Sequence, residues 1–141
     1  MITGPCGSGK TYIACAIAHQ ACRQGYRAKY YRLSRLLLEL AQADGSYSKA
    51  LQALSKLDLL ILDDWGLEPL TAPQRNDLME IVDDRHDLSS TLMISQLPTD
   101  RWYQSIGDHT LADAILDRLM HNAHRVKLKG ESMRKKQGII D

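Results

Sequence analysis

The chain has 141 residues, of which 44% are hydrophobic and 25% charged, and its formal net charge is +1. These values are ordinary for one soluble globular domain, and they exclude a polycation, so any surface that binds nucleic acid must be local. No apolar run approaches the roughly 18 residues of a membrane span, and no signal peptide is apparent, so we expect a cytoplasmic location and no membrane partner. The cysteines Cys6, Cys15 and Cys22 lack metal-binding spacing and are expected to be reduced thiols.

The first predicted element is a phosphate-binding loop. Residues 4–11 read Gly-Pro-Cys-Gly-Ser-Gly-Lys-Thr and match the pattern G-x-x-x-x-G-K-[ST] at every fixed position. Residues 1–3 fit the end of a strand, and residues 11–24 fit a helix with an apolar stripe. The stripe consists of Ile13, Ala14, Ile17, Ala18, Ala21 and Cys22. This order of strand, loop and helix is the setting that the motif requires.

The residue types of this loop explain its expected chemistry. Glycines let the backbone turn several N–H groups toward a polyphosphate, and the following helix adds its positive end. We expect Lys10 to reach the β- and γ-phosphates of ATP and the Thr11 hydroxyl to bind Mg²⁺. The candidate nucleotide-binding residues of this segment are Gly4, Gly7, Ser8, Gly9, Lys10 and Thr11.

Strands and helices are expected to alternate along the rest of the chain. Strands are predicted at residues 28–32, 59–62, 91–94 and 126–128, with the first and last of these at sheet edges. Helices are predicted at 34–43, near 51–57, at 74–87, around Trp102, and from Thr110 to about residue 119, where Asp113 would complete the cap. This alternation predicts an α/β fold with a three-layer parallel sheet and helices on both faces.

Two adjacent acids end the most apolar of these strands. Residues 59–62 read Leu-Leu-Ile-Leu and are followed by Asp63 and Asp64. A strand that is apolar on both faces belongs in the middle of a parallel sheet, where burying carboxylates is costly. We therefore expect Asp63 to hold Mg²⁺ through water and Asp64 to orient or deprotonate an attacking water. The alternative for Asp64 is a cap of the following turn.

Polar residues also follow the next strand. Ser95 or Gln96 is expected to touch the γ-phosphate or to position the water, and the alternative is a hydrogen bond at the strand end. Ligands of open α/β sheets bind along the carboxyl ends of the strands. The phosphate loop, the two acids and this polar pair should therefore converge on one nucleotide.

The end of the chain is basic. Residues 125–136 hold one acid, Glu131, among the basic residues Arg125, Lys127, Lys129, Arg134, Lys135 and Lys136. Such a cluster binds phosphate backbones without reading sequence, or it is a solvated polar end. We expect an ATPase core at residues 1–129 and a basic tail at 130–141.

These motifs resemble the IstB-like ATP-binding proteins, the helper ATPases of insertion-sequence transposition. This family is related to the DnaC and DnaI helicase loaders within the AAA+ superfamily of P-loop NTPases. The resemblance covers nearly the whole chain and includes Leu-Ile-Leu-Asp-Asp-Trp-Gly at 60–66 and Ser-Gln-Leu-Pro at 95–98. Its most specific parts are Leu-Ala-Asp-Ala-Ile-Leu-Asp-Arg-Leu at 111–119 and Gly-Glu-Ser-Met-Arg at 130–134.

The resemblance implies a role for individual residues. Asp63 and Asp64 stand at the Walker B positions, and many AAA+ proteins have glutamate at the second of these. Gln96 stands at the sensor 1 position, where asparagine is more usual. Arg118 looks like the arginine finger that acts on the ATP of a neighbouring subunit, and Arg134 looks like a sensor 2 arginine. The implied activity is Mg²⁺-dependent ATP hydrolysis, coupled to homo-oligomer assembly, to double-stranded DNA and to a transposase.

The sequence departs from the family in length. Family members usually carry a helical region and a full first strand before the phosphate loop, so the first strand is expected to be truncated here. Two alternatives remain open: a DnaC-like helicase loader, and a nucleotide-binding remnant without productive turnover. A P-loop kinase of small molecules would need an acceptor pocket and a basic lid, and the sequence indicates neither.

Overall fold

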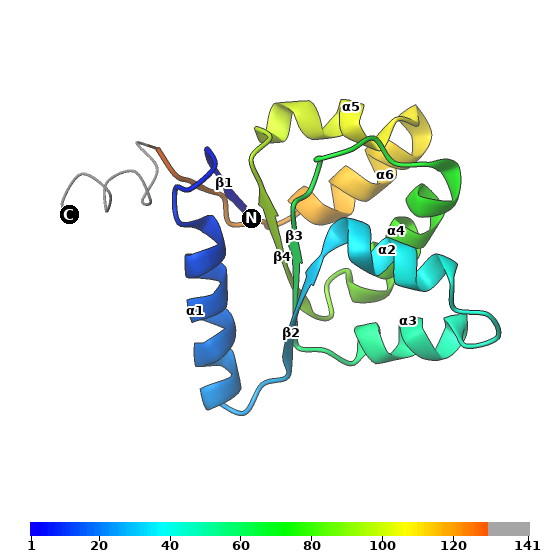
Figure 1. The fold of residues 1–141 in the computed structure, drawn as a ribbon, viewed down its shortest axis with the longest axis horizontal. Helices are drawn as coiled ribbons and strands as arrows, with labels where there is room; N and C mark the ends of the chain where they lie inside the picture. The colour runs from blue at the N-terminus through cyan, green and yellow to red at the C-terminus, as the bar shows by residue number, and fades with distance from the viewer. Residues whose placement is uncertain (130–141) are drawn as a thin grey trace.

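The strands form one parallel sheet, shown in Figure 1 as a computed structural model that describes residues 1–129. The strands are β1 (Ile2–Thr3), β2 (Ala28–Arg32), β3 (Leu59–Asp63), β4 (Ser90–Ser95) and β5 (Val126–Lys127), in the order β2-β3-β4-β1-β5. All pairs are parallel. The strands predicted from the sequence are confirmed, and β2 and β5 lie at the two edges as expected. The first strand is short, as predicted.

Helices cover both faces of the sheet, but unequally. On one face lies α1 (Lys10–Arg23), whose Ala14 packs against Leu59, Ile61 and Ile94 (Figure 1). The other face carries α2 (Leu33–Ala41), α3 (Tyr47–Ser55), α4 (Ala72–Arg85), the 3-10 turn η1 (Thr99–Arg101), α5 (Trp102–Ile106) and α6 (His109–Met120). The predicted three-layer α/β architecture is therefore confirmed.

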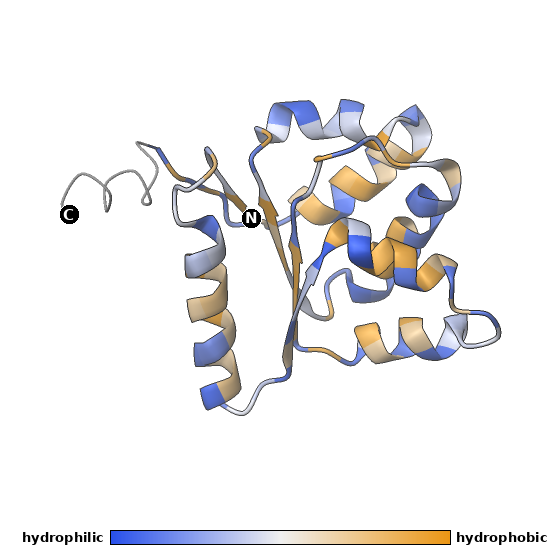
Figure 2. Ribbon diagram, viewed as in Figure 1, coloured by the Kyte–Doolittle hydropathy of each residue, from blue (hydrophilic) through white to orange (hydrophobic). Residues whose placement is uncertain are grey.

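The core follows from the alternation of side chains along β3. All five residues of this strand are buried. Leu59 and Ile61 face α1, whereas Leu60 and Leu62 belong to the larger cluster on the opposite face. Figure 2 shows the apolar strands β3 and β4 between α1 and the helices of the opposite face. A continuous apolar run is thus required here, because both faces of β3 lie in hydrophobic layers.

Two tryptophans anchor the larger core close to the ends of β3 and β4. Trp65 and Trp102 are 2% and 0% exposed, and their ring centroids lie 5.3 Å apart. The indole N–H of Trp102 donates to the carbonyl of Leu97 at 2.8 Å. Both rings therefore pack in the interior and offer no free face to a nucleotide base.

The start of α6 differs from its prediction. Asp108, rather than Thr110, is the N-cap, and its carboxylate accepts a hydrogen bond from the backbone N–H of Leu111 at 2.9 Å. Asp108 has the extended backbone (φ −128°, ψ 123°) that an N-cap needs, whereas Thr110 already lies inside the helix. Helix α2 likewise begins at Leu33, one residue before its predicted start.

The predicted helix is confirmed as α1, and its apolar stripe is only partly buried. Ala14 is fully buried, but Ile17 is 43% exposed and Cys22 is exposed. The reason lies in the sheet beneath. Strand β4 pairs with β3 from Ser90 to Met93, but it pairs with β1 only at Ile94 and Ser95. The C-terminal half of α1, with Ile17 and Ala21, therefore faces a cavity of about 760 Å³ instead of a strand.

Candidate nucleotide-binding site

The phosphate loop joins β1 to α1 at the carboxyl edge of the sheet. Gly7 and Gly9 have φ angles of 76° and 97°, in the left-handed region that favours glycine. Gly4 leaves no room for a side chain, because a Cβ there would lie 2.9 Å from the carbonyl oxygen of Leu128 and 3.0 Å from Oγ of Ser8. The glycine spacing of the motif is thus required by the backbone path.

This loop presents hydrogen-bond donors that the described residues do not satisfy. The N-cap of α1 is Gly9, so no side chain caps the helix, and no acidic residue occupies its first turn. The hydroxyl of Ser8 is buried without a partner within residues 1–129. Unpaired buried groups and the free N–H groups of a helix start both favour an anion. The loop therefore fits the phosphates of a nucleotide.

Lys10 lies across the loop. Its Nζ donates to the carbonyl oxygens of Gly4 and Pro5, each at 2.8 Å, and the residue is only 8% exposed. Burial lowers the pKa of the Lys10 ammonium, while Cys6 and the acids Asp63 and Asp64 act in the opposite direction. Two of the three N–H donors are used, so one remains for a phosphate oxygen.

Asp63 connects the phosphate loop to β3. Its Oδ2 accepts hydrogen bonds from the Thr11 hydroxyl at 3.1 Å and from the Tyr30 hydroxyl, and its Oδ1 accepts from the backbone N–H of Asp64 at 2.7 Å. A hydroxyl beside a carboxylate is the hard oxygen pair that suits Mg²⁺, which is held in nucleotide sites by few protein ligands plus phosphate. Residues 1–129 contain no cluster of three or more His, Cys, Asp or Glu that would cage a metal alone.

Asp64 leaves the strand in an unusual conformation. Its φ of 59° lies in the left-handed region, which aspartate tolerates better than most residues. Its Oδ2 accepts a hydrogen bond from Nε of Arg32 at 2.9 Å, in an ion pair at the open side of the sheet. The Asp64 side chain is 27% exposed, so its carboxylate lies outside the core.

Tyr30 and Arg32 are site residues that the sequence reasoning missed. Both lie on β2, which pairs with β3 in the register Tyr30 to Ile61 and Arg32 to Asp63. Burial raises the pKa of Tyr30, and the hydrogen bond to Asp63 adds to this effect. The available signal was their spacing of two in the strand predicted at 28–32, which places both side chains on the same face.

Ser95 and Gln96 have different roles. The buried Ser95 hydroxyl donates to the carbonyl of Trp65 at 2.5 Å and accepts from the N–H of Leu97 at 2.9 Å. The strand-end alternative is thus what the structure shows for Ser95. Gln96 is exposed at the carboxyl end of β4, and the neighbouring Ser95 carbonyl accepts from the N–H of Gly4 at 3.3 Å. Gln96 therefore lies beside the phosphate loop.

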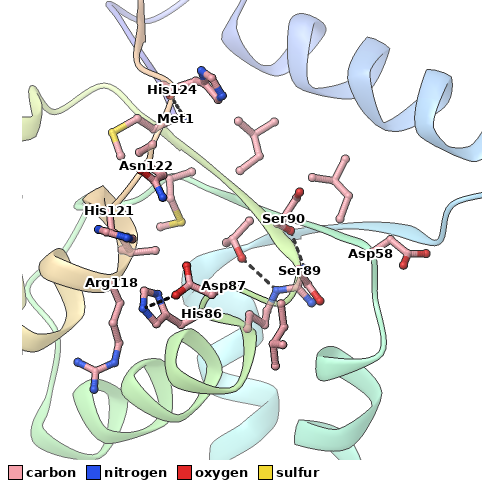
Figure 3. A pocket seen from close by; sticks show the side chains of 18 of the residues that line it. Met1, Asp58, His86, Asp87, Ser89, Ser90, Arg118, His121, Asn122 and His124 are labelled. Atoms are coloured by element: carbon pink, nitrogen blue, oxygen red, sulfur yellow. Dashed lines mark hydrogen bonds and ion pairs between the residues drawn. The ribbon is translucent and has the colours of Figure 1, made fainter.

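Arg118 lies away from this site. It lines the cavity at the amino ends of the strands together with Met1, His86 and His124 (Figure 3). Its Nε donates to Asp83 at 2.8 Å, and its Nη1 donates to the carbonyl of Ala114 at 3.0 Å. Arg118 therefore cannot reach the phosphate loop of its own chain. Arg134 and the predicted basic tail at 130–141 lie outside the described residues.

A comparison with protein families agrees with this geometry. The sequence model of the IstB-like ATP binding proteins matches residues 1–139. The chain belongs to this family.

One relative of this IstB-like chain is named an insertion sequence ATP-binding protein, from Sinorhizobium fredii. It is 52% identical over 138 residues, which cover 96% of this chain and 56% of the relative. A second, from insertion sequence IS21 of Pseudomonas aeruginosa, is 34% identical over 97% of this chain and 52% of its own length. The chain thus spans about half the length of the curated relatives it matches.

Solved structures show the same fold. The DnaI crystal structure superposes with a TM-score of 0.80 at 21% identity, over 91% of this chain and 71% of DnaI. Replication initiator DnaA, bound to AMPPCP and single-stranded DNA, superposes with a TM-score of 0.76 at 17% identity, over 92% of this chain and 40% of DnaA. The fold is therefore that of an AAA+ P-loop NTPase. Within residues 1–129, none of the helices is long and apolar enough to span a membrane.

Proposed function

We propose that this IstB-like protein binds and hydrolyses ATP and acts as a helper on DNA in the transposition of an insertion sequence. The observation that carries the proposal is the hydrogen bond of Thr11 to Asp63, which brings the phosphate loop and the acidic strand to one point. The family name and the insertion-sequence relatives support ATP as the nucleotide and transposition as the process.

The loop residues would bind the phosphates. The backbone N–H groups at the start of α1, the Ser8 hydroxyl and the remaining donor of Lys10 bind phosphate oxygens. Thr11 and Asp63 would hold Mg²⁺, which supplies positive charge to the β- and γ-phosphates when it is bound. Because Thr11 donates its proton to Asp63, the lone pairs of its oxygen remain free for the ion.

Hydrolysis needs an oriented water. Asp64 lies directly after Asp63, and its carboxylate would accept a proton from a water that attacks the γ-phosphate. Gln96, exposed beside the loop, would help to position that water. The products are ADP and phosphate, and the proton of the water passes to Asp64 and then to solvent.

The remaining roles require a second molecule. Arg118 is too far from its own phosphate loop, so it would act as an arginine finger on a neighbouring subunit when a homo-oligomer forms on ATP and double-stranded DNA. Arg125, Lys127 and Lys129 are exposed on β5 and directly beside it, and they would contact phosphates of the DNA. A transposase is the proposed protein partner, and the cytoplasm is the proposed location.

The test separates binding from turnover. Asp64→Asn should bind ATP as tightly as the wild type but hydrolyse it at least about a hundredfold more slowly, because the carboxylate that accepts the proton is lost, whereas the amide oxygen can still accept the hydrogen bond from Arg32. Lys10→Ala should lose binding as well. Undiminished hydrolysis by Asp64→Asn would contradict the assignment of the water-activating residue.

A helicase loader is the second candidate, favoured by the superposition on DnaI. The ATP site is the same in both candidates, so the partner decides between them. Retention of a transposase on the immobilised chain, without a replicative helicase, supports the transposition role, and the reverse supports the loader. Tight ATP binding without turnover under every condition would instead indicate a nucleotide-binding remnant.

A further inference from the structure

Two side chains of β2 reach the two consecutive acids of the site. Tyr30 donates its hydroxyl proton to Oδ2 of Asp63, and Arg32 binds Asp64. Residues 30 and 32 lie on the same face of an edge strand, and β2 pairs with β3 in register along its length. The pairing of these strands thus places an aromatic hydroxyl on the carboxylate proposed to serve Mg²⁺.

The carboxylate of Asp63 is fixed by donors from three directions. Thr11 approaches from α1, Tyr30 approaches from β2, and the N–H of Asp64 comes from the end of β3. Asp63 itself is 6% exposed, so its position depends on these contacts more than on water. Without the Tyr30 hydroxyl, Oδ2 would keep only the 3.1 Å hydrogen bond from Thr11.

We propose that Tyr30 is a positioning residue for the Mg²⁺ that accompanies the nucleotide. It orients the Asp63 carboxylate and, through the shared Oδ2, the hydroxyl of Thr11. This inference rests on the proposed ATP site. Groups that hydrogen-bond to metal-binding side chains commonly change metal affinity by about 10- to 100-fold when they are removed. Tyr30 acts through Asp63 and is not itself assigned as a ligand.

At this position the hydroxyl of Tyr30 can be removed without disturbing the fold. The residue is 38% exposed and lies on an edge strand, outside the two clusters of buried core residues. Replacing it with phenylalanine keeps the ring and removes only the donor. Tyr26→Phe is the matched control, because Tyr26 is 55% exposed and lines the cavity at the opposite edge of the sheet.

The experiment measures metal affinity rather than turnover. ADP is bound to the wild type, to Tyr30→Phe and to Tyr26→Phe, and Mn²⁺ is titrated while free Mn²⁺ is followed by electron paramagnetic resonance. Affinity for ADP is measured in parallel with Mg²⁺ and with EDTA. We expect Tyr30→Phe to bind Mn²⁺ about tenfold more weakly, with ADP affinity in EDTA unchanged. Tyr26→Phe should match the wild type throughout.

The outcomes separate this inference from the proposed function. Equal or tighter Mn²⁺ binding by Tyr30→Phe, with metal-dependent ADP binding in the wild type, would overturn the role of Tyr30 alone. If Tyr30→Phe lost the same amount of ADP affinity with Mg²⁺ and with EDTA, the role of Tyr30 would also be overturned, because damage to the fold weakens ADP binding whether or not the metal is present. Failure of the wild type to bind ADP under either condition would overturn both proposals.

Discussion

At the scale of single residues, Asp63 is where the phosphate loop, the edge strand and the acidic strand meet. Its two oxygens accept three hydrogen bonds, and two of these come from Thr11 and Tyr30, which are far away in sequence. The adjacent Asp64 is held by Arg32 instead. Neighbouring acids therefore have separate environments, as their proposed separate roles require.

Ser95 and Gln96 provide a test of structural against catalytic roles at adjacent positions. Ser95→Ala would leave the carbonyl of Trp65 and the N–H of Leu97 without their buried partner, so we expect a loss of about 1–3 kcal/mol in the free energy of unfolding. Gln96→Leu should change stability by less than about 0.5 kcal/mol but slow ATP turnover. Denaturant titrations and turnover assays check both, and the reverse pattern would contradict these roles.

Arg118 can be tested through its ion pair with Asp83. Arg118→Ala should abolish turnover that depends on assembly, while ATP binding by the monomer stays unchanged, because a finger acts only on a neighbouring subunit. Asp83→Ala is the matched variant: it removes the carboxylate that Arg118 contacts at 2.8 Å and should leave turnover intact or raise it. Turnover by Arg118→Ala equal to that of the wild type at high protein concentration would rule out the finger.

At the scale of secondary-structure elements, a buried arginine connects α4 to α3 and β4. Arg85 is 2% exposed, and burial lowers the pKa of its guanidinium. Its hydrogen bonds go to neutral acceptors, namely the carbonyls of Leu54, Leu57 and Ser90 and the hydroxyl of Thr91. The Arg85 guanidinium thus satisfies backbone carbonyl groups near the end of α3 and at the start of β4.

Removing this cation should destabilise the fold strongly. We expect Arg85→Met to lower the free energy of unfolding by about 3 kcal/mol or more, because it leaves several buried acceptors unpaired. Arg35→Met, at an exposed position of α2, should change it by less than about 0.5 kcal/mol. Chemical denaturation compares the two variants, and equal effects would show that the Arg85 contacts contribute little.

The short pairing of β1 with β4 gives a second prediction at this scale. Successive residues of a strand direct their backbone N–H and C=O groups to opposite neighbours. The N–H of Ser90 points toward the side of β3 and donates to the carbonyl of Asp58, the residue before that strand. Thr91 and Met93 therefore direct theirs toward the cavity that they line. The ammonium group of Met1 borders the same space, and burial lowers its pKa.

A strand segment added before Met1 should fill this cavity. Joining four β-branched apolar residues to the chain should slow hydrogen exchange at Thr91 and Met93 and raise the melting temperature by about 4 °C or more, which corresponds to roughly 1 kcal/mol. An extension of the same length made of glycine and serine is the control. Equal effects of both extensions would show that the segment does not pair with β4.

Local patterns explain which features the sequence could predict. The phosphate loop, the buried strand at 59–62 and the pair Asp63 and Asp64 are contiguous motifs; the strand is confirmed, and the binding roles of the loop and of the two acids stay predictions. Tyr30, Arg32 and Arg85 were missed because their roles depend on strand register and helix packing. The exposure of Ile17 could not be predicted either, because helical periodicity does not show which strands lie beneath the helix.

At the scale of the whole molecule, the sites lie at opposite edges of one sheet. The phosphate loop and Asp63 occupy the carboxyl edge, whereas Arg118 lies at the amino edge (Figures 1 and 3). The proposed finger role of Arg118 therefore requires the amino edge of one copy to face the carboxyl edge of a second copy. ATP hydrolysis should therefore rise more steeply than in proportion to protein concentration, and DNA that gathers subunits should stimulate it.

The most direct test is ATP turnover by the 141-residue chain, with and without double-stranded DNA, beside the Lys10→Ala variant. The account predicts phosphate release that DNA stimulates and that Lys10→Ala abolishes, because Lys10 spans the loop that binds the phosphates. Turnover that persists in Lys10→Ala, or a wild-type chain that neither binds nor hydrolyses ATP with DNA present, would contradict it.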